Sequence, residues 1–312
     1  MIRYVVLRIV DAVPTLLLVL TLVFLALRLL PGDPALVALG QNATADQLVL
    51  FRAKLGLDAP LWQQYVTFIL NVVRLHFGTS YMNNAPIGTL LMDNLPYTVE
   101  LAVAATILGV LIGMPLGVVS AIRRGHAIDY GARVFALLGF TVPDFYLGAL
   151  LLIGLSLNLG LFPINGGGDG GVVDNLYHLV LPALTLGLIM AAFVSRLTRS
   201  TLLEVLGRDY VRTARAKGAR EPRVIYRHAL RNALLPVATG LGLSILSTLS
   251  GSVAIEVIFG RPGLGSMLIN GIETRDYPVI QADLIVFSIF VVLVNLVMDL
   301  LNVFIDPRIR VT

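Results

Sequence analysis

The stretch RDYVRTARAKGAREPRVIYRHALRNALLP, from Arg208 to Pro236, holds eight of the chain's 23 Lys and Arg residues. The rest of the chain is apolar: 57% of its residues are hydrophobic, 13% are charged, and the mean hydropathy is +0.86. A soluble domain carries about 25% charged residues. The composition therefore indicates an integral membrane protein that gathers its positive charge into one loop. The chain has no cysteine, which excludes disulfides, iron–sulfur clusters and thiolate zinc sites.

Six segments come close to the ~20 apolar residues that a helix needs to cross a bilayer. They are Ile9–Leu30, Thr98–Ala121, Ala132–Leu159, Leu179–Val194, Ala233–Ile258 and Leu284–Ile305. Pro143 and Asp144 interrupt the third, so its span is expected to begin near Phe145, after an interfacial helix. The first is too long for the core of a signal peptide and is expected to be an uncleaved membrane helix. The sequence therefore predicts an all-α membrane protein with six transmembrane helices.

Lys and Arg are distributed unevenly among the connections between these segments. The second connection is rich in arginine, and the fourth, with its flanks, holds ten basic residues between Arg196 and Arg231. The third holds none, and the fifth holds only Arg261 and Arg275. Basic connections of membrane proteins face the cytoplasm. Both termini are therefore expected in the cytoplasm, and the connection 31–97 is expected outside.

The connection 31–97 is expected to be more than a loop. Two stretches within it, TADQLVLFRAKLGL and LWQQYVTFILNVVRL, have helical spacing, and Asp58-Ala-Pro60 separates them. They predict a small external subdomain; helices that lie on the bilayer surface are the alternative. The predicted domains are a first membrane helix (1–30), an external helical segment (31–97) and a core membrane domain (98–312) with a cytoplasmic loop at 196–232.

The second predicted span carries Gly109, Gly113 and Gly117 at intervals of four residues. Small residues at this spacing let two helices approach closely in lipid, where packing drives association. The pattern predicts that this face packs against another helix. Pro115 lies in the same face and is expected to kink the helix. Flexibility without a partner is the alternative to packing.

Within the basic loop, RDYVRTARAKGA predicts a short helix. Asp209 suits the positive end of such a helix, Gly218 can turn the chain at its other end, and Pro222 limits its continuation. Ala214 and Ala216, like Gly218, have little bulk, so a partner surface could come close. A basic loop that merely fixes the topology is the alternative.

Several kinds of chemistry have no motif in this sequence. No GxxxxGK[ST] occurs, which rules out a P-loop, and the four histidines form no HExxH. No GxSxG nucleophile elbow is present. The GxGxxG from Gly166 to Gly171 lies in GGGDGG after a membrane span and is interpreted as a flexible loop. We expect no catalytic residues and no metal site.

The basic loop resembles the coupling motif of the dipeptide/oligopeptide ABC transporter permease family. The matching positions are Glu204, Asp209, Ala214, Ala216, Lys217, Gly218, Asn232 and Pro236. RLLPGDPA, LGLDAPLWQQY, NLPYTVELA, IEVIFGRPGLGSMLINGIETRDYPVIQAD and FIDPRIR also resemble the family, in order along nearly the whole chain. The resemblance is closest to the first permease subunit, which has the long external segment. Leu75 and His76 depart from it, because the family usually has a Gly-acidic pair there.

The resemblance implies a type I importer fold in a bacterial cell membrane, inner or plasma, with a pathway for dipeptides or oligopeptides. It implies a heterodimer with a second permease subunit, two cytoplasmic ATPase subunits that bind ATP and Mg, and an external substrate-binding protein. The chain itself would be no enzyme and would need no cofactor and no nucleic acid. Family members import dipeptides, longer peptides, glutathione, haem or nickel complexes, so the substrate stays open. The residues implied in ATPase coupling are Glu204, Asp209, Ala214, Ala216, Lys217 and Gly218.

On the predicted external side, LGSMLINGIETR has helical spacing and is expected to form a short helix that ends before Tyr277-Pro278. Glu256 lies near the outer end of the fifth span, and Arg275 and Asp276 follow the short helix. The hypothesis is that these three charges form an outer gate or contact the binding protein. Helix capping and solvation of a loop are the alternative.

Two other functions compete with an ATP-driven importer. An ion-coupled secondary transporter would need charged groups within the membrane and often has inverted repeats, and neither is clear in this sequence. An intramembrane peptidase would need a nucleophile with its base, or a metal set, and no such set is recognised.

Overall fold

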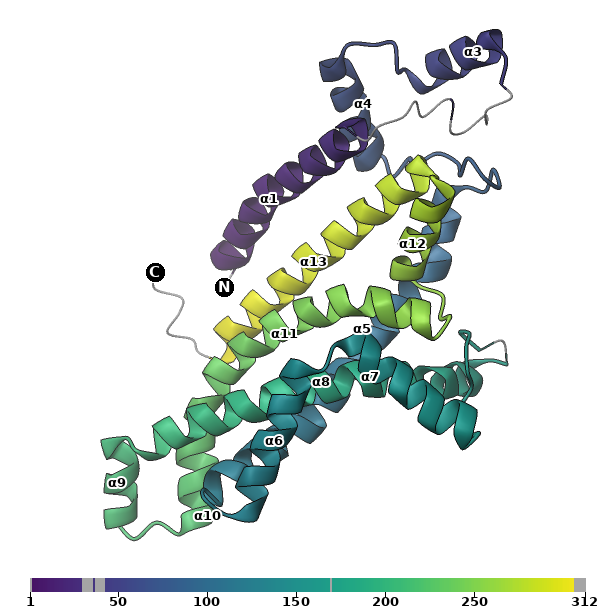
Figure 1. The fold of residues 1–312 in the computed structure, drawn as a ribbon. Helices are drawn as coiled ribbons and strands as arrows, with labels where there is room; N and C mark the ends of the chain where they lie inside the picture. Colours follow the sequence, from purple (N-terminus) through teal and green to yellow (C-terminus); the bar gives the residue numbers. More distant parts are fainter. Residues whose placement is uncertain (1, 30–35, 37–42, 169, 306–312) are drawn as a thin grey trace. The chain divides into compact units, whose positions relative to one another are not determined.

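The structure is a computed structural model that describes residues 2–29, 36, 43–168 and 170–305. The elements in this part of the chain are helices (Figure 1). Their bounds are α1 Ile2–Leu29, α3 Ala45–Leu55, α4 Leu61–Val73, α5 Ile87–Ile122, α6 Ala127–Thr141, α7 Asp144–Leu151, α8 Val172–Leu206, α9 Asp209–Ala216, α10 Glu221–Arg223, α11 Arg231–Ile258, α12 Leu264–Thr274 and α13 Tyr277–Ile305. Two π-helical segments, η1 (Leu152–Asn158) and η2 (Val224–Leu230), continue α7 and α10.

The described residues divide into two compact units. The core unit contains Tyr97–Arg261 and the chain from Val294 onward; the second unit contains Ile2–Pro96 and Pro262–Leu293. The core unit thus holds most of α5 and all of α6 to α11. The second unit holds α1, α3, α4 and α12, with the first turns of α5 and most of α13.

Each of the six predicted membrane segments coincides with helical structure. Four lie within single helical runs that are long and apolar enough to cross a bilayer: Ile87–Ile122, Val172–Leu206, Glu221–Ile258 and Tyr277–Leu300. The first corresponds to α1, whose apolar part is Val10–Ala26. The third is a pair of helices bent by 107°. The all-helical membrane fold predicted from the sequence is therefore confirmed.

The bend in the third segment lies where the sequence predicts it. α6 ends at Thr141, and Pro143 in an extended conformation (φ −59°, ψ 142°) precedes the first residue of α7, Asp144. The proline ring disfavours a helical conformation at the preceding Val142, which has ψ 121°. The proline therefore ends α6, and the chain leaves it in a new direction.

The connection 31–97 contains the two helices predicted for it. Thr44 begins α3 with a capping box, because its hydroxyl accepts from the Gln47 N–H while the Gln47 side chain accepts from the Thr44 N–H. Gly56, at φ +65°, ends α3 in the left-handed conformation. α4 packs through Phe68 against Phe24 of α1. The chain's one tryptophan, Trp62, is 70% exposed near the start of α4. Most of RLLPGDPA and FIDPRIR lies outside the described residues.

The helices α5 and α8 are in close contact within the core unit. A Cβ atom at Gly113 would lie 2.5 Å from the backbone oxygen of Ala191, and one at Gly117 would lie 2.5 Å from that of Ser195. At Gly109 the nearest atom would instead be Cγ of the Met190 side chain, also at 2.5 Å. The predicted packing face is thus confirmed: the three glycines face one ridge of α8, and two of them touch its backbone.

We predict a graded response when these glycines are replaced by alanine. Gly113→Ala and Gly117→Ala should separate the helices, because a backbone carbonyl cannot move aside, and should each cost several kcal/mol. Gly109→Ala should cost less, since Met190 is flexible. The measurement is the yield and thermal midpoint of the detergent-purified chain. Gly131→Ala is the matched control, because its added Cβ would meet no atom within 4 Å; equal behaviour of all four variants would contradict the packing argument.

Candidate functional site

The short helix predicted in the basic loop is α9, Asp209–Ala216. It projects with α10 from the ends of α8 and α11 (Figure 1). Asp209 in its first turn and Arg215 in its last turn both match the helix dipole. The helix ends before Pro222, which stands at the start of α10, so this proline begins the next helix rather than stopping α9.

Gly218 ends this helical turn in the left-handed conformation, at φ +78°. Its N–H donates to the Arg215 oxygen at 2.9 Å, and the Ala219 N–H donates to the Ala214 oxygen at 3.2 Å. A Cβ atom at Gly218 would meet no atom within 4 Å. Backbone conformation, rather than lack of space, therefore favours glycine here.

One apolar side chain fixes α9 to the core unit. Val211 is fully buried, whereas the other side chains of α9 are exposed or partly exposed. It packs in a cluster with residues of α8, η2 and α11, including Leu202, Val224 and Ala233. Burying a valine contributes roughly 2 kcal/mol. The position of α9 therefore follows the ends of the long helices to which this cluster belongs.

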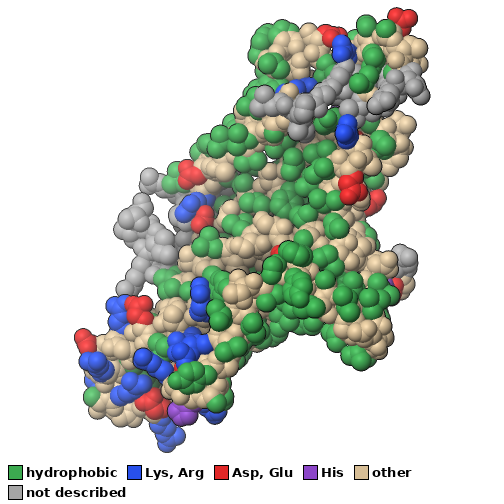
Figure 2. All heavy atoms as spheres, viewed as in Figure 1, with side chains coloured by type: hydrophobic (Ala, Val, Ile, Leu, Met, Phe, Trp, Pro, Cys, Tyr) green, Lys and Arg blue, Asp and Glu red, His purple; other side chains and the backbone are tan. Residues whose placement is uncertain are grey.

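The exposed surface of α9 and its neighbours is mainly basic, and Figure 2 shows Lys and Arg side chains gathered over this end of the core unit. Glu204 pairs with Arg208, and Arg215 pairs with Glu221 at 2.8 Å. The Asp209 side chain is 98% exposed and lies 3.7 Å from Arg212. Ala216, Lys217 and Gly218 are exposed and Ala214 is partly so. The structure thus brings the predicted coupling residues onto one accessible surface.

A buried carboxylate close to this end was missed by the sequence analysis. Asp129 of α6 is 1% exposed and accepts hydrogen bonds from Arg199 Nε of α8 at 2.6 Å, Ser120 Oγ of α5 at 2.7 Å and the Gly125 N–H at 3.0 Å. These bonds join three helices of the core unit. Such a charge is stable when buried because each of its oxygens has a donor.

The three predicted gate residues lie in different surroundings. Glu256, in the last turn of α11 in the core unit, is fully buried and accepts from the Thr98 hydroxyl at 2.7 Å. In the second unit, Arg275 is exposed with φ +57°, and Asp276 is buried. Asp276 accepts from the Ser80 hydroxyl and the Tyr81 N–H. Burial, and then the Asp276 carboxylate, raise the pKa of Tyr81 to about 12, so this phenol stays neutral at physiological pH.

Arg261, which directly follows α11, was also missed as a site residue. It is fully buried, and its Nη2 donates to Glu100 Oε2 at 2.9 Å and to Asn175 Oδ1 at 2.8 Å. Its guanidinium carbon lies 5.0 Å from the centre of the Tyr97 ring. One side chain thereby links α5 and the start of α8 to the end of α11 within the core unit. Its place in a glycine-rich connection gave no periodic signal that could reveal this role.

We predict that Arg261→Met destabilises the core unit, because Glu100 and Asn175 lose their shared donor. Since the Glu100 side chain is 40% exposed and can be hydrated, the expected loss is about 2 kcal/mol, below the 3–5 kcal/mol of a fully buried pair. Arg261→Lys should lose less stability than Arg261→Met, because lysine keeps the positive charge but lacks the planar guanidinium with its fork of donors. Thermal unfolding of the purified chain measures the effect. Arg275→Met, which removes an exposed arginine, is the control; an equal loss there would refute the assignment.

A helical membrane core from which a short basic helix projects is the architecture of a transport permease. Comparison with known proteins gives the family. The description "Binding-protein-dependent transport system inner membrane component" matches residues 113–311, and the N-terminal part of such a component matches residues 1–102. The chain belongs to this family of ABC importer permeases, and it is a multi-pass membrane protein without the ATP-hydrolysing role. These findings support the ATP-driven importer and give no support to the ion-coupled alternative.

Relatives of similar length are known. The chain is 42% identical over 310 residues to the glutathione transport system permease protein GsiC of Salmonella choleraesuis (strain SC-B67), with 99% of both chains covered. It is 41% identical over the same length to the protein of that name from Escherichia coli (strain K12).

Solved structures show the same fold. The MetNI methionine ABC transporter in an inward-facing conformation matches with a TM-score of 0.56 at 19% identity, over 71% of this chain and 98% of that chain. An amino acid ABC transporter with histidines matches with a TM-score of 0.52 at 18% identity, over 70% of this chain and 94% of that chain. Both similarities concern the fold alone.

Proposed function

We propose that this permease forms part of a pathway for short peptides, with glutathione as the first candidate. The observation that carries this proposal is the 42% identity to a glutathione permease across 99% of both chains. The partners would be a second, homologous permease subunit, two cytoplasmic ATPase subunits that bind ATP and Mg, and an external binding protein. In this arrangement both termini and the basic loop lie in the cytoplasm.

The proposed contact with an ATPase subunit is α9. Its small residues, Ala214, Ala216 and Gly218, are accessible, and its buried Val211 joins it to the ends of α8 and α11. Movement of a docked ATPase would therefore reach the long helices through this one packing cluster. Glu204, Asp209 and Lys217 would supply charged contacts around it. Glu256, Arg275 and Asp276 are proposed to act at the outer side, as a gate or as contacts of the binding protein.

The substrate is tested in proteoliposomes that contain the complete complex and its binding protein. We expect uptake of labelled glutathione or of a labelled dipeptide to require ATP. Uptake that continues without ATP and stops when the ion gradient is removed would overturn the proposal. ATP-driven uptake of a nickel complex alone would keep the importer and replace the peptide substrate.

We predict that Gly218→Pro uncouples transport. Proline fixes φ near −65° and removes the N–H that donates to Arg215, so it cannot replace a residue at φ +78°. Gly218→Asn is the matched control, because asparagine tolerates the left-handed conformation and its Cβ meets no atom. The readout is substrate-stimulated ATPase activity with co-purification of the subunits. We expect activity to fall at least about tenfold in Gly218→Pro and to stay within about twofold in Gly218→Asn; wild-type activity in both would remove α9 from the coupling route.

A further inference from the structure

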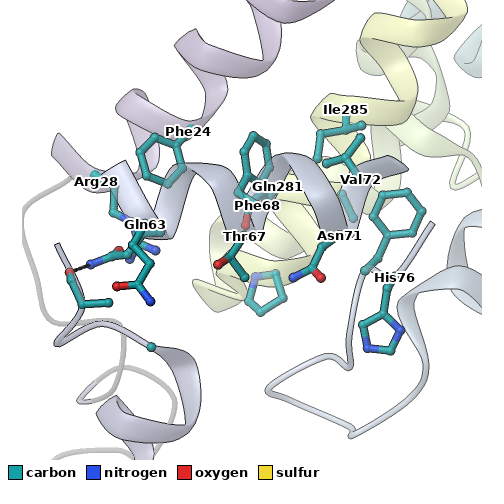
Figure 3. Close-up of a pocket in the computed structure, with 16 residues that line it drawn as sticks. Phe24, Arg28, Gln63, Thr67, Phe68, Asn71, Val72, His76, Gln281 and Ile285 are labelled. Atoms are coloured by element: carbon teal, nitrogen blue, oxygen red, sulfur yellow. Dashed lines mark hydrogen bonds between the residues drawn. The ribbon is translucent and has the colours of Figure 1, made fainter. Parts of the chain in front are cut away.

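A cavity of about 290 Å³ opens within the second unit, between α1, α4 and the start of α13 (Figure 3). Its volume lies near the lower end of the ~300–1,000 Å³ of small-molecule sites. The wall includes the apolar side chains Phe24, Phe68 and Ile285. The other lining residues include a large polar set: Arg28, Gln63, Gln64, Thr67, Asn71, His76 and Gln281. None of the roles described above uses this cavity.

The charge of the cavity favours an anion. Its lining includes the guanidinium of Arg28 and the imidazole of His76, but no carboxylate. Figure 3 shows these two side chains on opposite sides of the cavity. The Arg28 guanidinium carbon lies 5.4 Å from the centre of the Phe24 ring. This cation–π contact joins two side chains of α1. An arginine so placed can offer its fork of N–H donors to a carboxylate or a phosphate.

The side-chain amide of Gln64 adds a second requirement, a hydrogen-bond donor on the ligand. Gln64 Nε2 donates to the Leu57 oxygen at 3.0 Å and to the Ala59 oxygen at 2.7 Å. Its Oε1 is buried and has no hydrogen-bond partner among the described residues. A buried acceptor without a partner costs about 1–3 kcal/mol, so it favours a ligand with an N–H or O–H. A phosphodiester group has no such donor of its own, although a glycerol headgroup attached to it has hydroxyls, whereas every peptide bond except one to proline has an N–H.

The turn that follows α4 brings His76 to the cavity. Leu75 adopts a left-handed conformation at φ +55°, and the His76 N–H donates back to the Asn71 oxygen at 2.8 Å. A leucine in this conformation costs about 1 kcal/mol. The turn places an imidazole, rather than an acidic group, on the wall of the cavity.

We propose that this cavity binds a short peptide by its C-terminal carboxylate, which Arg28 holds while a peptide N–H pairs with Gln64. The polar rim of Gln63, Asn71 and Gln281 would hold the remaining backbone. The inference rests on the proposed function in that the ligand is the peptide cargo, and it adds a receiving site on the external segment of the permease itself.

The test measures binding to the full-length chain in phosphatidylcholine nanodiscs by equilibrium dialysis, without the binding protein. The probes are labelled trialanine and its C-terminal amide, which differ only in the carboxylate. We expect saturable binding of trialanine at least about tenfold tighter than that of the amide, because one charge-assisted contact is lost. Arg28→Gln should remove this preference. His76→Asp should weaken the binding of trialanine more than that of the amide, since it places a carboxylate of the protein in the same cavity as the carboxylate of the ligand.

Arg74→Gln is the matched control, because Arg74 is exposed at the end of α4 and does not line the cavity. A variant that only misfolds reduces the number of sites but not the ratio of the two affinities. The proposal is wrong if trialanine does not saturate, if both probes bind equally to the wild type, or if Arg28→Gln keeps the preference. It is also wrong if phosphatidylglycerol nanodiscs abolish binding, because the occupant is then a lipid headgroup. If the complex takes up peptide with ATP but the cavity does not bind trialanine, the cavity proposal is wrong and the proposed function stands. If the cavity binds trialanine but the complex takes up no peptide, the proposed function is wrong and the cavity proposal stands.

Discussion

The core unit depends on how closely the backbones of α5 and α8 approach. In lipid there is little hydrophobic gain from pairing two apolar helices, so close contact must supply the stability. Gly113 and Gly117 allow that contact, because a Cβ atom at either would collide with a backbone oxygen of α8. One buried ionic contact of the core unit depends on it. Asp129 can bond to Ser120 of α5 and Arg199 of α8 only because the two helices are held together.

Features with a local cause were predictable from the sequence. The break at Pro143, the end of the α9 turn at Gly218 and the helices α3 and α4 depend on residues within a few positions of each other, and the structure has all of them. The lengths of the helices were predicted less accurately. α5 begins at Ile87 and α8 continues to Leu206, well beyond the apolar segments Thr98–Ala121 and Leu179–Val194, because hydropathy reports the part suited to lipid and not the helix that continues past it.

The buried ionic contacts could not be predicted in the same way. Arg261 bonds to Glu100, and Asp129 bonds to Arg199, across separations of 161 and 70 residues. No periodicity links such positions. A lone arginine in a glycine-rich connection and an aspartate near the start of a helix both have ordinary explanations, as loop solvation and as a favourable helix-dipole charge. For the same reason the surroundings of Glu256 were not foreseen, although its place at the end of the fifth span was.

The single tryptophan gives this chain a spectroscopic use. Trp62 stands at the start of α4, exposed and next to Gln63, which lines the cavity of the second unit. Because Trp62 is the one indole of the sequence, the tryptophan fluorescence of the isolated permease comes from one known position. The sequence also contains no thiol. A single cysteine introduced elsewhere can therefore carry an acceptor dye without background labelling. The distance from the start of α4 to any chosen point on the membrane helices then becomes measurable by energy transfer in a lipid bilayer.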